Sequence, residues 1–259
     1  MAKHTDRYTN ENLVNIAKQK YENTQKSTLP TEIVYLPSKG KIYPKTSPLS
    51  EGKLEMRYMT AYDEDILTNA SYVKDGVTID KLLEALITTN VSVDDIALVD
   101  KDALILSARI VSYGAKYPVS VTDPNTGKRI TRDVDLKKLK HKKIDINSDE
   151  NGEITYKLPS GITLKYSYIS SGNSKTLKEE SSTSSFLLNV IKQVDDSREP
   201  DVIENFLKTK FLIQDSKKFQ NHVLNNSPGI NFEYEFEGED GGTFTSTFPI
   251  GADLFWPES

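Results

Sequence analysis

Residues 100–114 read DKDALILSARIVSYG, and this stretch decides the fold because apolar side chains occupy nearly every side of it. A segment that is apolar all round is typical of a helix buried in the middle of a protein. Asp100 has the side chain of an N-cap, and Gly114 allows the left-handed backbone that often ends a helix. The sequence therefore predicts a central helix that begins at Asp100 and stops at Gly114.

Arg109 interrupts the apolar surface of this predicted helix. Because an unpaired buried charge is costly, its guanidinium needs a carboxylate partner or a route to solvent. A catalytic cation is the alternative use of such a residue. The sequence favours a structural ion pair.

The composition limits what surrounds this helix. A chain of 259 residues, with 36% hydrophobic and 27% charged residues, can bury one sizeable core or two small ones. The formal net charge of −5 gives no sign of general nucleic-acid binding. The composition is that of an ordinary globular protein.

Cysteine is absent from the sequence, which excludes disulfides, thiolate catalysis and Cys-based zinc sites. His4, His141 and His222 are too few for a histidine-rich metal site, and no Asp/Glu loop has cation-binding spacing. We therefore expect no metal and no cofactor. No run approaches ~18 apolar residues and the first ten residues are polar, so we expect no membrane contact and a cytosolic protein.

The N-terminal residues 1–30 are predicted to form a helical arm, because residues 12–26 carry a thin amphipathic pattern. A frayed arm is favoured over a helix that docks on a partner. A strand is predicted at 32–36, and Pro37 and Pro44 then bracket a Ser-Lys-Gly turn. This turn lacks the spacing of a phosphate-binding loop and is followed by no helix.

Residues 53–59 alternate as a strand, and Thr60 with Asp63 forms an aspartate version of the capping box at the start of a helix. The acidic residues here could also be a catalytic pair or metal site, but capping explains them. A second helix is predicted from Thr78, and it should pack on the central helix. Its apolar stripe consists of Ile79, Leu82, Leu83, Leu86 and Ile87. Asp94 and Asp95 are expected to cap a short turn between the two helices.

After Gly114 the pattern alternates with period two and predicts a hairpin over 117–134, with a turn at 123–127 and an edge position at Pro118. The run KKLKHKK at 137–143 is the only dense basic segment. A solvated helix face is favoured over a phosphate-contacting site, because no aromatic residues are interleaved for base stacking.

The remainder predicts a pair of strands within 144–158, a third strand at 162–168, and a Ser/Thr-rich linker or mobile loop near 171–185. Helices follow at 186–194, 201–213 and from Asp215 or Ser216 to about Leu224. Their shared core should consist of Phe206, Phe211, Phe219, Val223 and Leu224. A last hairpin spans 232–248, with glutamates on its wet face. Leu254, Phe255, Trp256 and Pro257 then form an apolar end that folds back on the core or inserts into a partner.

Four motifs in order resemble the base-plate hub assembly proteins of T-even-type contractile-tailed bacteriophages, over most of the chain from about Leu36. They are LPSKG at 36–40 with Tyr43, MRYMT at 56–60 with DEDIL at 63–67, RIVSYG at 109–114, and FWP at 255–257. Members of that family often carry a Cys-Pro-x-Cys-Gly knuckle where this chain has TDPNTG at 122–127. An ordinary turn replaces the zinc-stabilised one, which weakens any metal claim.

The resemblance implies a non-enzymatic phage tail assembly protein, a component or assembly factor of the base-plate hub that acts through protein contacts. Its partners would be other hub, spike, tail-tube or tape-measure proteins, and self-association is an open alternative. It would act in the host cytoplasm during assembly and then either leave or stay in the virion base plate.

Two other functional classes are weighed against the hub. An enzyme is disfavoured, because the sequence contains no Ser-His-Asp arrangement, no HExxH motif and no Gly-rich dinucleotide turn. The runner-up is a nucleic-acid-binding module that uses the hairpins, the 137–143 run and the tyrosines Tyr156, Tyr166 and Tyr168.

The predicted fold class is α+β. The expected parts are the arm at 1–30, a helical and β-hairpin body at 31–170, the linker at 171–185, and a C-terminal helix and hairpin unit at 186–259. The candidate partner-binding residues are Leu36, Pro37, Tyr43, Phe255, Trp256 and Pro257. Phe255 and Trp256 are chosen because aromatic side chains often form interaction hot spots, while packing on the last hairpin is the competing hypothesis.

Overall fold

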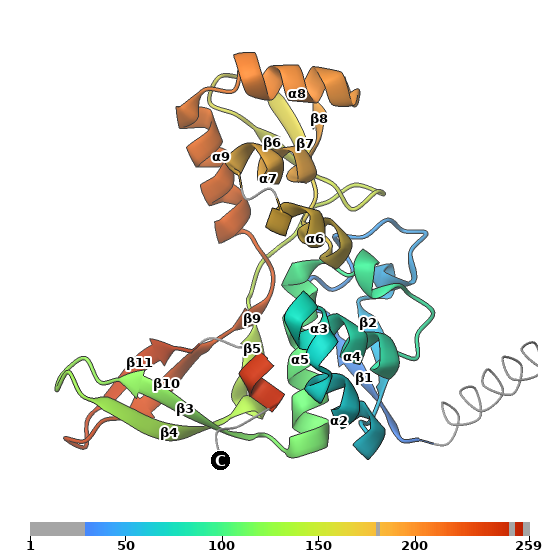
Figure 1. Ribbon diagram of the computed structural model, residues 1–259. Helices are drawn as coiled ribbons and strands as arrows, with labels where there is room; N and C mark the ends of the chain where they lie inside the picture. The colour runs from blue at the N-terminus through green and yellow to red at the C-terminus, as the bar shows by residue number, and fades with distance from the viewer. Residues whose placement is uncertain (1–28, 180–181, 249–251, 256–259) are drawn as a thin grey trace, which may run out of the picture.

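A computed structural model describes residues 29–179, 182–248 and 252–255. The predicted helix at 12–26, and Trp256 and Pro257, lie outside these residues. Helices and small antiparallel sheets are separate along the chain, which confirms the α+β class. Figure 1 shows a helical body, an arm of two hairpins that extends from it, and an upper lobe that stands above both.

The body combines a two-stranded antiparallel sheet with four helices among the described residues. Strand β1 (Thr31–Tyr35) pairs with β2 (Lys53–Arg57). The helices are α2 (Ala61–Thr68), α3 (Ala70–Asp75), α4 (Thr78–Leu86) and α5 (Leu98–Tyr113). The predicted stripe of α4 faces inward and contacts α5, since Leu82, Leu83 and Leu86 are fully buried.

Helix α5 is the predicted central helix, but it begins earlier than expected. Its N-cap is Ala97, so the prediction that Asp100 caps it is wrong. Asp100 lies in the first turn and is fully buried, where its carboxylate accepts hydrogen bonds from Ser38 N (2.8 Å), Ser38 Oγ (2.6 Å) and Tyr43 Oη (2.7 Å). An acid in the first turn is also stabilised by the helix dipole, so Asp100 binds a distant segment instead of closing its own helix.

Among the described residues Arg109 has no carboxylate partner, so the predicted ion pair is wrong there. Its guanidinium is buried and donates to the backbone carbonyls of Leu254 (2.7 Å), Gly114 (2.6 Å) and Lys116 (3.2 Å). Carbonyl oxygens can satisfy a buried guanidinium because its planar fork offers several donors at fixed angles. Burial also lowers the pKa of Arg109. Arg109 thus has the structural role that the sequence favours, but its hydrogen-bond partners are backbone carbonyls.

The capping box at the start of α2 is confirmed. The Asp63 carboxylate accepts hydrogen bonds from Thr60 N (2.7 Å) and Thr60 Oγ1 (3.0 Å). It also accepts hydrogen bonds from both terminal nitrogens of Arg57. These hydrogen bonds leave the pKa of Asp63 below its usual value despite the opposing effect of burial. The 3-10 turn η2 (Val93–Asp95) lies between α4 and α5, and its N-cap is Ser92. The predicted capping role of Asp94 and Asp95 is therefore wrong.

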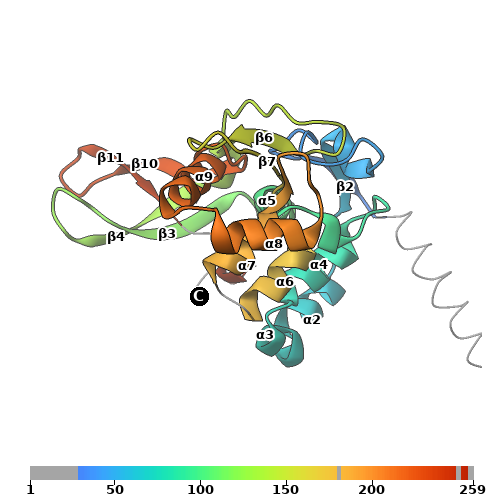
Figure 2. The ribbon, with the colours of Figure 1, turned by 90° about the horizontal axis from the view of Figure 1, so that it is seen from above.

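The arm consists of two stacked hairpins. Strand β3 (Lys116–Thr122) pairs with β4 (Arg129–Asp135), and β10 (Glu233–Glu237) pairs with β11 (Thr243–Thr247), which confirms both predicted hairpins. They lie side by side in Figures 1 and 2. The Lys128–Glu239 ion pair (2.8 Å) and a hydrogen bond from Arg132 Nε to Glu237 O (3.0 Å) connect them.

The basic run 137–143 does not form the expected helix face. It contains the end of a single 3-10 turn, η3 (Leu136–Lys138), and the short strand β5 (Lys140–His141). Strand β5 pairs with β9 (Ile230–Asn231), so this run lies where the chain returns from the upper lobe to the arm. Leu136 is buried beneath it, and a backbone tied down by strand pairing cannot continue as a helix.

The upper lobe contains a three-stranded sheet in the order β6-β7-β8. These strands are β6 (Ile154–Lys157), β7 (Thr163–Tyr166) and β8 (Ile191–Val194). The predicted pair of strands in 144–158 reduces to β6, with an isolated bridge between Ser148 and Ile154 before it. The helix predicted at 186–194 is also wrong in its second half, because α7 (Thr183–Val190) ends where β8 joins the sheet edge.

A helix replaces part of the predicted structureless linker. Helix α6 (Ser171–Glu179) sits at the junction of the upper lobe and the body in Figure 1. Lys175 pairs with Asp94 (2.6 Å) and Asp80 (3.4 Å), which also pairs with Lys101. These tertiary ion pairs hold a segment whose sequence is almost without apolar residues. The division of the chain into four parts remains a prediction.

The described residues form two hydrophobic cores, and each core combines side chains that are far apart in the sequence. One core includes the body, the arm and Phe255, while the second joins β6–β8 to α7, α8 (Pro200–Thr209) and α9 (Ile213–Asn225). Phe206, Phe219 and Val223 are buried in the second core as predicted, and Phe211 packs partly against it. Leu224 is 71% exposed, so its predicted place in this core is wrong.

Replacing Leu104 with alanine should lower the free energy of unfolding by about 2–5 kcal/mol, because the side chain is fully buried in α5 and truncation leaves a cavity. Leu212→Ala is the matched control, since that side chain is 65% exposed and should change stability by less than about 0.5 kcal/mol. Urea denaturation measures both. Equal effects for the two variants would contradict the position of the core.

Candidate functional site

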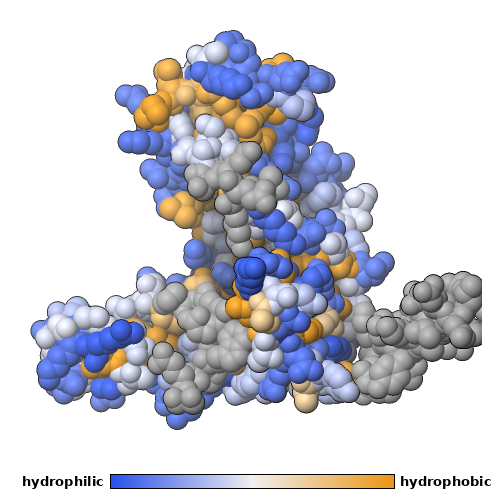
Figure 3. Space-filling view, in the orientation of Figure 1, coloured by the Kyte–Doolittle hydropathy of each residue, from blue (hydrophilic) through white to orange (hydrophobic). Residues whose placement is uncertain are grey.

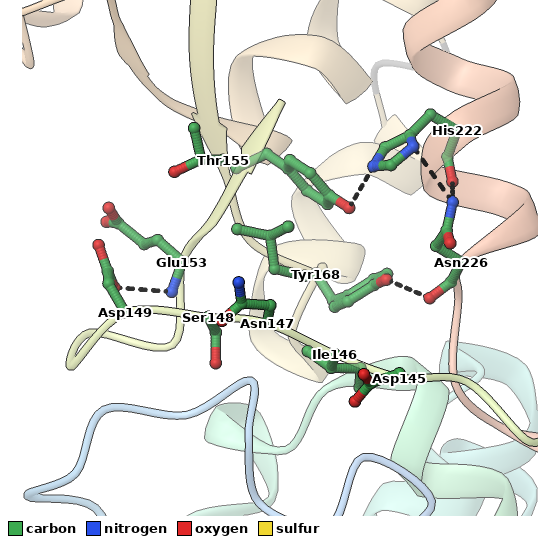
Figure 4. A pocket seen from close by; sticks show the side chains of 12 residues that line it. Asp145, Ile146, Asn147, Ser148, Asp149, Glu153, Thr155, Tyr168, His222 and Asn226 are labelled. Atoms are coloured by element: carbon green, nitrogen blue, oxygen red, sulfur yellow. Dashed lines mark hydrogen bonds between the residues drawn. The ribbon is translucent and has the colours of Figure 1, made fainter. Parts of the chain in front are cut away.

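A hollow of about 410 Å³ lies between the upper lobe and the body. Segment 145–149 borders it from below, while strands β6 and β7 and the end of α9 border it from above (Figure 4). The side chains that line it are Asp145, Ile146, Asn147, Ser148, Asp149, Glu153, Ile154, Thr155, Tyr166, Tyr168, His222 and Asn226.

His222 is the titratable ring of this pocket. Its Nε2 lies 3.2 Å from Tyr166 Oη, and its Nδ1 lies 3.1 Å from Nδ2 of Asn226. The same Asn226 nitrogen donates to the His222 carbonyl oxygen (2.8 Å), which fixes the amide with its NH₂ toward the ring. An NH₂ group can only donate, so Nδ1 accepts and the proton of the neutral ring lies on Nε2.

Aromatic packing holds the ring in place. Tyr156 stacks on it with ring centroids 4.2 Å apart, and Tyr166 meets it edge-on at 5.8 Å. Burial lowers the pKa of His222 and raises the pKa of Tyr166 to about 12. Burial therefore favours the neutral form of both groups.

The carboxylates of the pocket already have cationic partners. Asp149 pairs with Lys165 (2.7 Å), Glu153 forms a bidentate pair with Arg198 (2.9 and 2.7 Å), and Asp145 contacts Lys41 at 3.3 Å. Hydrogen bonding from Lys165 lowers the pKa of Asp149. The site therefore offers hydrogen-bond acceptors, paired carboxylates and aromatic surface.

The described residues show no assembled chemical centre of another kind. No group of three or more His, Asp or Glu side chains among them could hold a metal ion. None of the helices in the described ranges is long and apolar enough to cross a membrane.

The candidate partner-binding residues lie mostly in the interior. Leu36, Pro37 and Tyr43 are buried around the turn that Asp100 holds, and Tyr43 Oη also accepts from Ala97 N (3.1 Å). Phe255 is 3% exposed and packs edge-on against Tyr113 with centroids 6.2 Å apart. These side chains are inaccessible in this conformation, so their role in partner binding stays a prediction without support from exposure.

The residues of the nucleic-acid hypothesis are not brought together. Tyr166 is fully buried, and Tyr156 and Tyr168 are half-buried, with Tyr168 donating to Asn226 O (2.7 Å). Their rings pack on one another and on Phe219 in the upper lobe, so none lies free for base stacking. The lysines of the 137–143 run are exposed, without an aromatic platform beside them.

Sequence reasoning missed the pocket because its walls come from parts of the chain far apart in sequence. The alternation of Tyr166 and Tyr168 was visible, but the pairing of Tyr166 with His222 spans 56 residues. The Asn226–His222 spacing of four was the available local signal, since residues four apart share a helix face.

A comparison with protein-family models identifies the family of this chain. The model described as "T4 bacteriophage base plate protein" matches residues 30–248, which is most of the chain. The chain belongs to the T4 bacteriophage base plate protein family. This confirms the coarser part of the resemblance. Neither the curated proteins nor the solved structures gave a match.

The matched range 30–248 includes the body, both hairpins of the arm and the upper lobe. The match therefore includes most of the described fold, and the pocket lies between residues of the two cores.

Acidification should destabilise the protein partly through His222. Burial lowers its folded-state pKa below the ordinary 6.5, so the unfolded chain binds the proton more readily. The stability it contributes is present above the unfolded pKa and is lost as pH falls through the folded pKa. Melting temperatures between about pH 7.5 and 5 should therefore fall more steeply for the wild type than for His222→Gln. His141, whose pKa burial also lowers, is retained in both proteins as the internal control. Parallel pH profiles would contradict the assignment.

Proposed function

We propose that this protein is a component or assembly factor of the base-plate central hub and acts through protein contacts. The observation that carries the proposal is the match of residues 30–248 to the T4 base plate family. On this proposal its partners are other hub, spike, tail-tube or tape-measure proteins. It would act in the host cytoplasm, and it would do so without catalysis.

The surface chemistry supports contact rather than catalysis. Large apolar side chains are exposed on the upper lobe, and Figure 3 shows apolar surface gathered there. They include Leu188, Val202, Leu212, Ile213 and Leu224. Clusters of exposed apolar residues on a soluble protein mark interaction sites. The carboxylates of the pocket, by contrast, are paired.

A phage with an early stop codon in the gene for this chain should fail to complete its base plates. Electron microscopy of infected-cell lysates should show tail tubes and fibres without assembled base plates, and wild-type protein supplied from a plasmid should restore them. Base plates of normal number and shape in the stop-codon infection would refute the assembly role.

Mass spectrometry of particles from the rescued infection separates a component from an assembly factor. Retention of the chain in purified tails identifies a component, while its loss after assembly identifies a factor. The presence of the chain in intermediates that contain no hub protein would refute the hub assignment.

A further inference from the structure

An apolar groove of about 200 Å³ opens between α7 and α9, above the first turn of α5. It is separate from the pocket around His222, since the two hollows share only Tyr168. Its lining residues are Leu98, Val99, Tyr168, Ile169, Phe186, Val190, Gln220, Val223, Leu224 and Ser227. None of them is charged, so the groove itself can bind only through apolar and neutral polar contacts.

Helix α9 extends this groove with one side of its outer surface. Ile213, Lys217, Gln220 and Leu224 follow one another at spacings of four, three and four, which places them in a single stripe. Ile213 is 72% exposed and Leu224 is 71% exposed. The buried side of α9 is carried by Phe219 and Val223, so the stripe contributes little to the core of the lobe.

The dimensions of the stripe suit a helix. Leu224 lies eleven positions after Ile213, and at 1.5 Å per residue the stripe is about 16.5 Å long. That length equals about three helical turns, over which a partner helix presents apolar residues at i, i+3/i+4, i+7 and i+11. An extended peptide would instead require a free strand edge, which α9 does not have.

The charges along the stripe determine which helix fits. Lys217 lies between the two apolar ends, and Lys218 follows it on the exposed side. Neither lysine makes an ion pair within the described ranges of the chain. An ammonium group amid apolar contacts must stay hydrated or meet an anion, because its desolvation without a partner is costly. A partner with acidic residues beside its apolar stripe satisfies this requirement.

We propose that the α7–α9 groove and the Ile213–Leu224 stripe form a docking site for an acidic amphipathic helix of another base-plate protein. The proposal rests on the proposed function for the source of the partner. The helix lies along α9, its apolar residues contact Ile213, Leu224 and the groove, and a carboxylate pairs with Lys217. This is helix-in-groove recognition, in which apolar anchors give affinity and charge selects the partner.

Two synthetic helical peptides test this site directly. The first carries leucines at i, i+4, i+7 and i+11 with glutamates beside them, and the second replaces every glutamate with lysine. Fluorescence anisotropy with the purified full chain should show the acidic peptide binding at least about tenfold more tightly than the basic one. Raising the salt concentration should reduce that preference, since it depends on exposed charge.

Variants locate the binding on α9. The double variant Ile213→Glu with Leu224→Glu should lower the affinity for the acidic peptide at least about tenfold. Lys217→Glu should make the basic peptide bind more tightly than the acidic one. Tyr62→Glu is the matched control, because Tyr62 is 81% exposed on α2 and should leave binding unchanged. All these side chains are exposed, and circular dichroism melting checks that the variants keep their fold.

Three results would overturn the proposal: no binding of either peptide, equal binding of both, or wild-type affinity in the double α9 variant. A concentration-dependent dimer in sedimentation that the same variant dissociates would assign the surface to a second copy and also overturn it. These peptide results do not depend on infection, so failure here is distinguishable from failure of the assembly role.

Discussion

Two charged side chains of α5 lie in the interior, and the need to satisfy them determines where distant parts of the chain run. Near one end of the helix, Asp100 takes its hydrogen bonds from Ser38 and Tyr43. Near the other end, Arg109 donates to three backbone carbonyls, one of them Leu254 O. Removing the partners of a buried charge costs several kcal/mol, which is comparable to the stability of a small protein. Helix α5 thus binds three segments: the turn at 36–43, the start of the arm at 114–116, and the C-terminal turn that contains Leu254.

The upper lobe is attached near the first turn of the same helix. Ile169 O accepts from Leu98 N (2.9 Å), and Ser171 donates to Ile96 O through both its backbone and its side chain. A pocket lined by His222 and an apolar groove lined by Gln220 and Leu224 both lie along α9. A base-plate protein with these two surfaces can present chemically different faces from one rigid helix.

The sequence predicted the elements whose signals are local and missed those fixed by distant partners. Thr60 and Asp63 are three residues apart, so their capping box was readable. The carbonyl partner of Arg109 at Leu254 lies 145 residues away, and no local pattern specifies it. Helix α6 was hidden for the same reason, because Lys175 is held by Asp80 and Asp94 of the body. At the site, His222 was noted only as one of three histidines, since its ring is placed by tyrosines of another element.

Native-state hydrogen exchange of an Asp100→Asn variant tests most directly whether the buried charge organises its surroundings. Asparagine keeps the size of the side chain but replaces one acceptor oxygen with a donor that faces Ser38 or Tyr43. Amides of residues 36–43 should then lose protection by at least about tenfold relative to wild type, whereas those of β10 and β11 should not. Unchanged protection in residues 36–43, or an equal loss across the whole chain, would contradict the central role given to Asp100.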